Sequence, residues 1–248
     1  MRMEILKKYS ILLLIAITAC DSPESPDCFK SRGNDAVEVR SLTWFNAIEV
    51  LDYIEVEIQM DSVRYIEIRG GENLLPKIST RVQNNILHLE NDNTCNFVRS
   101  FNHQISVTIH TPELQSLVLQ DGSGPVRSFG TLTGDSLFLE TNHASGDIHL
   151  DLDYRTAVCL FPTGTSNVEL AGEVEQVEIF SDSFGLIDAR ELHAQKALVN
   201  NSSINDFYIW PSEYFYAAIN SRGNIYVRGT ASSHDIDDNG SGSVLYFE

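Results

Sequence analysis

Apolar and polar residues alternate along much of this chain with the period of a β-strand. Apolar side chains separated by one polar residue fall on the same side of an extended strand, and the other side then faces water. No segment after the first twenty residues has the apolar spacing that an amphipathic helix needs. In the first half of the chain the alternation is found in residues 54–58, 65–68, 86–89 and 105–109. The pattern predicts an all-β protein.

The second half of the chain repeats this pattern about every twenty residues. Six apolar triplets mark the repeat: Leu117–Leu119, Leu137–Leu139, Val158–Leu160, Val177–Ile179, Ala197–Val199 and Ala217–Ile219. After each triplet come a polar turn and a further apolar position, and a last copy begins at Ile236. Two short strands and two turns per repeat are typical of one coil of a β-solenoid. We therefore expect a right-handed parallel β-helix with coils of about 20 residues and less regular N-terminal strands.

The triplets are also apolar on their outward side, where a strand that faces water would carry polar residues. The middle residues of the triplets point away from the coil interior, and Val118, Phe138 and Leu198 are among them. A strand that is apolar on both faces is normally covered on both faces. We favour cover by another part of the chain. The alternative is an interaction surface for a partner or for a second copy of the chain.

The first twenty residues have the pattern of an export signal. Arg2, Lys7 and Lys8 precede the apolar run Ile11–Ile17, which is too short to cross a bilayer as a helix. Small residues then lead to Cys20. This order is typical of a bacterial lipoprotein signal peptide, residues 1–19, that is cleaved before an acylated Cys20. An ordinary signal peptide with an accidental cysteine is the alternative.

The rest of the chain divides into a tether and one domain. Residues 20–35 are acidic and proline-rich and predict an extended tether. Residues 36–248 predict a single β-solenoid domain, with irregular coils over 36–111 and regular repeats over 112–248.

Three further cysteines follow Cys20 in what would be an oxidising compartment. Cys28 and Cys95 both lie in polar, loop-like surroundings, and we expect them to form a disulfide. Cys159 lies within an apolar run, so we expect a buried free thiol there.

The composition excludes several classes of partner. The chain has 248 residues, of which 42% are hydrophobic, and a formal net charge of −18. This apolar content is enough to bury a core. The negative charge argues against nucleic-acid binding, which needs clustered Lys and Arg. It also disfavours electrostatic docking on an anionic membrane surface, so membrane contact would come from the lipid anchor.

One strand-like segment places several chemically capable side chains on one face. In the alternating run from residue 147 to residue 153, Asp147, His149, Asp151 and Asp153 share one side. Carboxylates beside an imidazole can bind a metal ion or act as acid and base. A solvated outer face on an acidic protein is the alternative, and we favour it.

A second acidic segment matches the opening of a calcium loop. Asp235, Asp237 and Asn239 have the Asp-x-Asp-x-Asn-Gly spacing of such a loop. The twelfth position, where a full loop has glutamate, is Tyr246. We therefore favour a polar turn that closes the last coil over a calcium site.

Other signatures of catalysis are missing from the sequence. It contains neither a Gly-x-Ser-x-Gly nucleophile elbow nor a glycine-rich phosphate loop, and we expect no cofactor. Aromatic residues cluster late in the chain, where they could stack on sugar rings. We favour a place in the core or at its cap for these residues, which are Tyr208, Trp210, Tyr214, Phe215 and Tyr216.

Several segments of the chain together resemble a known bacterial lipoprotein family. These segments are Phe45–Val50, Glu72–Leu75, Cys95–Phe101, Pro112–Leu114 and the Gly-Ser-Gly and Gly-Asn-Ile turns. They resemble the auto-transporter adhesins with a head GIN domain, over roughly residues 28–248. Some coils depart from the pattern because they lack the glycine turn, as at Thr165–Asn167. The resemblance implies a β-helix fold and an envelope location, and an adhesin role by analogy of architecture.

Three functions remain open at this point. The first is a lipid-anchored, non-catalytic adhesin of the outer membrane that presents a solenoid face to glycan or protein, toward the cell surface or the periplasm. The second is an enzyme acting on polysaccharide through the Asp147–Asp153 face. The third is a structural subunit of an envelope complex, or a homo-oligomer, assembled through the Val118, Phe138 and Leu198 face. We favour the first.

Overall fold

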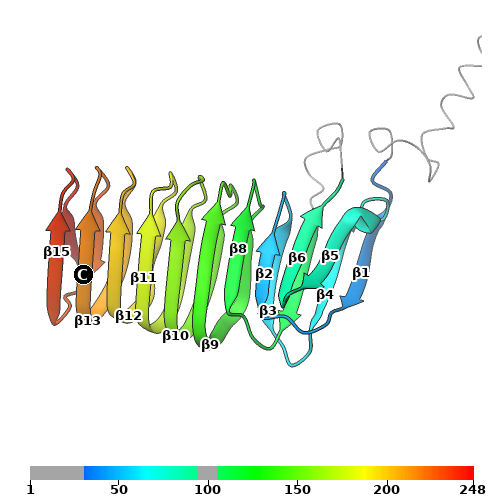
Figure 1. Ribbon diagram of the computed structural model, residues 1–248, viewed down its shortest axis with the longest axis horizontal. Helices are drawn as coiled ribbons and strands as arrows, with labels where there is room; N and C mark the ends of the chain where they lie inside the picture. The colour runs from blue at the N-terminus through cyan, green and yellow to red at the C-terminus, as the bar shows by residue number, and fades with distance from the viewer. Residues whose placement is uncertain (1–30, 94–104) are drawn as a thin grey trace, which may run out of the picture.

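The structure, a computed structural model, describes residues 31–93 and 105–248, which form a β-solenoid (Figure 1). The all-β prediction is confirmed, since the described residues form sixteen strands and one short 3₁₀-helix. The predicted signal peptide, Cys20, Cys28 and Cys95 lie outside the described residues. The proposed Cys28–Cys95 disulfide therefore stays a prediction.

The elements follow one another in the order in which the chain winds. The first half contains β1 (Asp35–Ser41), β2 (Ala47–Val50), β3 (Glu55–Met60), β4 (Tyr65–Gly71), η3 (Leu75–Lys77), β5 (Ile78–Gln83), β6 (Ile86–Asn91), β7 (Ser106–Thr111) and β8 (Ser116–Gln120). The second half contains β9 (Val126–Asn142), β10 (Ile148–Phe161), β11 (Val168–Ser181), β12 (Ile187–Asn201), β13 (Phe207–Ile219), β14 (Ile225–Arg228), β15 (Ser233–Asp238) and β16 (Val244–Phe247).

The solenoid has two sheet faces. Strands β9 to β13 are long, and the first part of each lies on one face while the last part lies on the other. The triplet face consists of β5, β6, β2 and β8, the last parts of β9 to β13, and β15. The groove face, named for a depression described below, consists of β1, β4, β7 and β3, the first parts of β9 to β13, and β14 and β16. Parallel pairing between coils satisfies the backbone, and alternate side chains fill the interior.

On the triplet face, the coils from β9 to β12 have one constant length, but their neighbours do not: Leu117 pairs with Leu139, 22 residues later, and Val199 pairs with Ala217, 18 residues later. Cys159 pairs with Leu139 on one side and with Ile179 on the other, so the inward positions lie 20 residues apart. Val158 and Leu160, which the triplet placed inward, point outward instead. The prediction was wrong here because β10 ends in five consecutive apolar residues, which hide the alternation. Cys159 is the buried free thiol that the sequence predicted, and its burial raises the pKa of the thiol to about 12.

The N-terminal strands are less regular, as predicted, and their coils do not stack in chain order. The coil made by β2 and β3 lies between the later coil of β6 and β7 and the coil that begins with β8. Strands β1, β4 and β5 then close this end through antiparallel pairs. An antiparallel cap protects the end of a parallel sheet from pairing with other chains.

The body of the domain begins slightly earlier than residue 36. The backbone amides of Glu72 and Asn73 donate to the carbonyls of Asn34 and Arg32, and β1 starts at Asp35. Arg40 on β1 joins two strands of this cap, because its guanidinium donates to the carbonyl oxygen of Ile78 on β5 at 2.6 Å. The last residues assigned to the tether are thus part of the folded cap.

Candidate functional site

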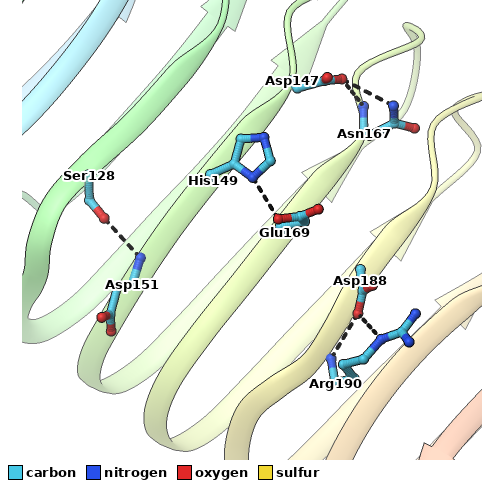
Figure 2. A network of polar contacts seen from close by, with 8 residues as sticks. All are labelled: Ser128, Asp147, His149, Asp151, Asn167, Glu169, Asp188 and Arg190. Carbon is cyan, nitrogen blue, oxygen red and sulfur yellow. Dashed lines mark hydrogen bonds and ion pairs between the residues drawn. The ribbon is translucent and has the colours of Figure 1, made fainter.

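The four residues Asp147, His149, Asp151 and Asp153 lie on or beside β10 and face away from the core. The alternation that predicted this is present, since Ile148, Leu150 and Leu152 between them are buried. All four belong to the groove face, where Figure 2 shows the first three with their partners. Their shared face is therefore observed, and their chemistry depends on what each one contacts.

Asp147 is used in the architecture of the turns. Its Oδ1 accepts hydrogen bonds from the backbone amide and the side-chain amide of Asn167, one coil later, at 3.3 and 3.1 Å. The same arrangement joins Asp206 to Asn224 at 2.8 and 3.1 Å. These four residues each stand directly before the first inward residue of a coil. Asp or Asn recurring at that place is the signal from which the sequence could have predicted a polar ladder.

His149 pairs with a carboxylate from the next coil. Its Nδ1 lies 2.7 Å from Oε2 of Glu169, which is its register neighbour on β11. The histidine side chain is 50% exposed and the glutamate side chain 63% exposed, so water screens the pair. The two residues are 20 positions apart, one coil, and the repeat alone could have identified Glu169.

Asp151 and Asp153 have different surroundings from His149. The backbone N–H of Asp151 donates to the hydroxyl of Ser128 at 2.9 Å, which ties β10 to β9 where the register between these strands shifts. The carboxylate of Asp151 is half-buried, and Asp153 is exposed. The face is thus a spread of separate groups. Among the residues that the structure describes, no three His, Cys, Asp or Glu side chains are grouped to hold a metal ion.

These side chains border a shallow depression of about 500 Å³ on the groove face. Its rim includes Ser128, His149, Asp151, Glu169, Asp188 and Arg190. A second depression of about 380 Å³ lies over β3, β7 and β9 and shares His149 with the first. We call the two together the groove. It crosses the strands from β7 to β12, because those strands are neighbours in the sheet.

The end of the groove at β12 is held by an ion pair. Nε of Arg190 donates to Oδ1 of Asp188 at 2.8 Å, and the backbone amide of Arg190 donates to the same oxygen at 3.2 Å (Figure 2). The carboxylate of Asp188 raises the pKa of Arg190. With Asp151, Glu169 and Glu191 also lining this part, four carboxylates stand against one guanidinium.

The aromatic residues that follow are mostly outside the core. Tyr208 lies between Arg190, 4.0 Å from its ring centre, and Tyr226, stacked on it at 4.9 Å. Trp210 lies between His193 on β12, at 4.8 Å, and Arg228 on β14, at 4.3 Å. Because the partners come from the strands on either side, the ring faces are covered and only their edges meet water.

Only one of the five late aromatic residues lies in the core. Phe215 is buried, as favoured from the sequence, whereas Tyr214 and Tyr216 point outward on the triplet face. Their hydroxyls donate to the carboxylates of Asp235 and Asp237 at 2.9 and 2.7 Å. The hydrogen bonds to these carboxylates raise the pKa of both tyrosines.

The segment that matches the opening of a calcium loop is mostly a strand. Asp235 and Asp237 lie on the extended strand β15, and Asn239 follows the strand. Residues that alternate along a strand do not curl around an ion as a calcium loop does. The two carboxylates accept hydrogen bonds from tyrosines of β13 instead. Asp235 and Asp237 thus lie on a strand, and Asn239 lies in the polar turn between β15 and β16. A calcium site at this segment stays a prediction.

The triplet face carries the outward apolar residues that the sequence indicated. Phe138, Val158, Leu160 and Leu198 are half-buried there, and Phe180 is 41% exposed. Val118 lies on the same face, on β8. We expected another segment of the chain to cover these side chains. Within residues 31–93 and 105–248, every strand belongs to the wound sheet, and none lies over this face (Figure 1).

In the same described ranges, no helix is long and apolar enough to cross a membrane. Comparison with protein families gives a match over residues 44–244 to a family described as "Putative auto-transporter adhesin, head GIN domain". A search of curated proteins finds no match.

Solved structures with a similar fold come from Bacteroides and Parabacteroides species. A "putative adhesin" from Bacteroides fragilis is 20% identical, with a TM-score of 0.79, over 86% of this chain and 97% of that chain. A "putative adhesin" from Parabacteroides merdae is 19% identical, with a TM-score of 0.62, over 88% and 98%. A "putative lipid binding protein" from Parabacteroides distasonis is 18% identical, with a TM-score of 0.66, over 88% and 98%. At these identities the likeness concerns the fold.

Proposed function

This chain belongs to the auto-transporter adhesin, head GIN domain family, and from that premise we propose that it is a lipid-anchored, non-catalytic binding protein of the bacterial cell envelope. The family and two of the three structural neighbours named above are described as adhesins, which are cell-surface proteins that hold a ligand. On this proposal the solenoid is a rigid support, and one of its faces binds a glycan or a protein outside the cell.

The groove is the observation that carries this proposal. It is exposed, it is lined by polar groups, and it crosses several coils whose backbone is fixed by parallel pairing. A rigid sheet holds its outward side chains in place without needing a ligand, which lowers the entropy cost of binding.

The enzyme alternative has weaker support from the same residues. Asp147 is engaged in a turn ladder, and His149 is paired with Glu169 in a water-exposed position. Catalytic acids and bases usually act where the closed site excludes water. The exposed arrangement favours recognition over catalysis.

The anchor rests on the sequence alone and needs its own test. We expect the protein on intact cells to be removed by added protease when it carries Cys20, because acylation would hold it at the outer surface. In the Cys20→Ala variant we expect the protein to leave the membrane fraction. Antibody detection after protease treatment of unbroken cells measures the first, and antibody detection in separated membrane and soluble fractions measures the second.

Protection of the wild-type protein until the outer membrane is permeabilised would contradict a surface role. A cytoplasmic protein of known location, probed in the same samples, controls for cell breakage. Membrane retention of the Cys20→Ala variant would contradict the lipid anchor and would leave the surface location to be explained otherwise.

The triplet face supports a second candidate, assembly into an envelope complex. Several apolar side chains on this face are in contact with water, and Phe180 is 41% exposed. Exposed apolar patches often mark sites of protein contact. If two copies meet there, Phe138→Lys combined with Leu198→Lys is expected to halve the molar mass measured by light scattering. A wild-type protein that is already monomeric would exclude the homo-oligomer. A test for binding to other envelope proteins would then decide whether this face takes part in an envelope complex.

A further inference from the structure

We propose that the groove binds an extended chain of uncharged sugars, laid across the strands from β7 to β12. The inference rests on the proposed function, since it names the ligand class of that same face. It is carried by the shape of the groove, by the chemistry of its lining, and by the covered state of the nearby aromatic rings.

The shape of the groove suits a linear polymer. Neighbouring strands of a sheet are about 4.8 Å apart, so the six strands from β7 to β12 place its ends about 24 Å apart. The two depressions meet at His149 and run perpendicular to the strands. A compact metabolite would occupy only a fraction of this length, whereas a chain of several sugars would follow it.

The lining offers the groups that sugar hydroxyls use. Each carboxylate oxygen accepts hydrogen bonds, and hydroxyl groups can donate to two oxygens of one carboxylate. Asp151, Glu169 and Glu191 supply such acceptors on three successive strands, and Arg190 supplies donors. The periodic strands therefore present acceptors at regular intervals along the groove.

The charge of the groove selects against acidic polymers. Four carboxylates line the depression over β10 to β12, and its one guanidinium is already paired with Asp188. The second depression adds Glu55, Glu57 and Asp147 against Arg69 and Arg127, so seven carboxylates face three guanidiniums along the groove. An acidic polysaccharide would meet like charge there and in the field of the whole protein, whose net charge is −18. A neutral sugar chain has no such penalty.

An extended peptide fits the groove less well than a glycan. Peptides that lie on sheets usually pair with a free strand edge, through which their backbone is satisfied. The strands under the groove are each paired on both sides, so they offer no free edge.

The aromatic side chains near the groove limit the ways in which the sugars could be held. The ring faces of Tyr208 and Trp210 are covered by neighbouring side chains, so they are not available for stacking on sugars. Binding would then depend on hydrogen bonds spread along the groove. Each sugar would contribute little, and affinity should grow with chain length.

The test uses the mature protein, solubilised in detergent, with defined oligosaccharides as probes. Gluco-, manno- and xylo-oligosaccharides of two to six units represent neutral chains, and oligogalacturonates of the same lengths represent acidic ones. Isothermal titration is expected to detect at least one neutral hexamer. We expect its dimer to bind about tenfold or more weakly, and the oligogalacturonates not to bind.

A pair of variants localises the binding. Ala171→Trp fills the floor of the groove and is expected to weaken the hexamer about tenfold or more. Gln176→Trp places the same side chain on the same strand but on the triplet face, and should leave binding unchanged. Circular dichroism checks that both fold. If Ala171→Trp does not fold, Glu169→Lys at an exposed rim position replaces it, with the same expected loss.

Three results would overturn the inference. They are preference for the acidic probes, lack of binding by every neutral hexamer, or equal losses in the groove variant and in Gln176→Trp. These results do not depend on where the protein lies on the cell. A surface-exposed protein that binds no neutral glycan would retain the proposed function with another ligand, and a protein protected in the periplasm that binds one would retain only the inference.

Discussion

Replacing Gly185 by alanine is expected to destabilise the solenoid by roughly 3 kcal/mol, a large effect for one methyl group. A Cβ at this position would overlap the carbonyl oxygen of Ser166 in the preceding coil. That oxygen belongs to the backbone of a packed turn and cannot move aside as a flexible side chain can. Gly185 does not have a positive φ, so the loss would come from the clash alone.

Gly122 provides the matched control for this substitution. Its φ of +75° disfavours any residue with a side chain, yet its Cβ would meet no atom within 4 Å. Gly122→Ala should therefore cost about 1 kcal/mol from backbone strain. Urea unfolding followed by circular dichroism measures both variants. Equal shifts of the midpoint would show that close packing between the turns of adjacent coils does not limit the stability of the stack.

The same close approach explains why the fold could be predicted from the sequence. Gly146, Gly223 and Gly242 lie against the backbone of the preceding coil in the way that Gly185 does. A turn that repeats in space needs a small residue at the same interval in sequence, so the glycine turns and the apolar triplets both marked the coil. Each regular coil pairs with the coils that precede and follow it in the sequence. The repeat in the sequence is therefore enough to predict the arrangement of the second half.

The first half could not be predicted in the same way. The coil of β2 and β3 lies between β6–β7 and β8–β9, so its neighbours in space are not its neighbours in sequence. Alternation identifies such strands, but it does not say which of them pair. That choice depends on long-range pairing and on the antiparallel cap, and neither leaves a period in the sequence.

The candidate site was half predictable for a related reason. Alternation placed His149 and Asp151 outward, which the structure bears out. Their partners come from other coils, and finding them requires the register between strands. Glu169 follows His149 by one coil and was open to prediction. Arg190, which lines the same depression, was not open to prediction in this way, because β12 has an irregularity in register between Asp188 and Glu191 that shifts the count.

The C-terminal end of the solenoid leads to the second prediction of large effect. At the other end β1, β4 and β5 form an antiparallel cap, but here β15 pairs only with β13 and β16 pairs only with β14. Every residue of β15 is exposed. An open strand edge of this kind invites pairing with another chain, and charged residues on the edge are the usual protection. Asp235, Asp237 and Asp238 supply that charge.

Replacing these three aspartates by valine is expected to make the protein associate as its concentration rises. Valine favours strand pairing, and the substitutions remove three negative charges from the edge. Light scattering on fractions from size-exclusion chromatography measures the molar mass over a range of concentrations. We expect the mass of the variant to increase at concentrations at which the wild type keeps a constant mass.

A second triple variant separates the edge from the charge. Replacing Asp153, Glu173 and Glu175 by valine removes the same number of charges from β10 and β11, which are paired on both sides. That variant should keep the wild-type mass, because its new apolar side chains lie on strands without a free backbone edge. If both variants associate equally, net charge rather than edge protection keeps the copies of this protein apart. The wild-type protein should then also associate in 1 M salt, where charges are screened beyond about 3 Å.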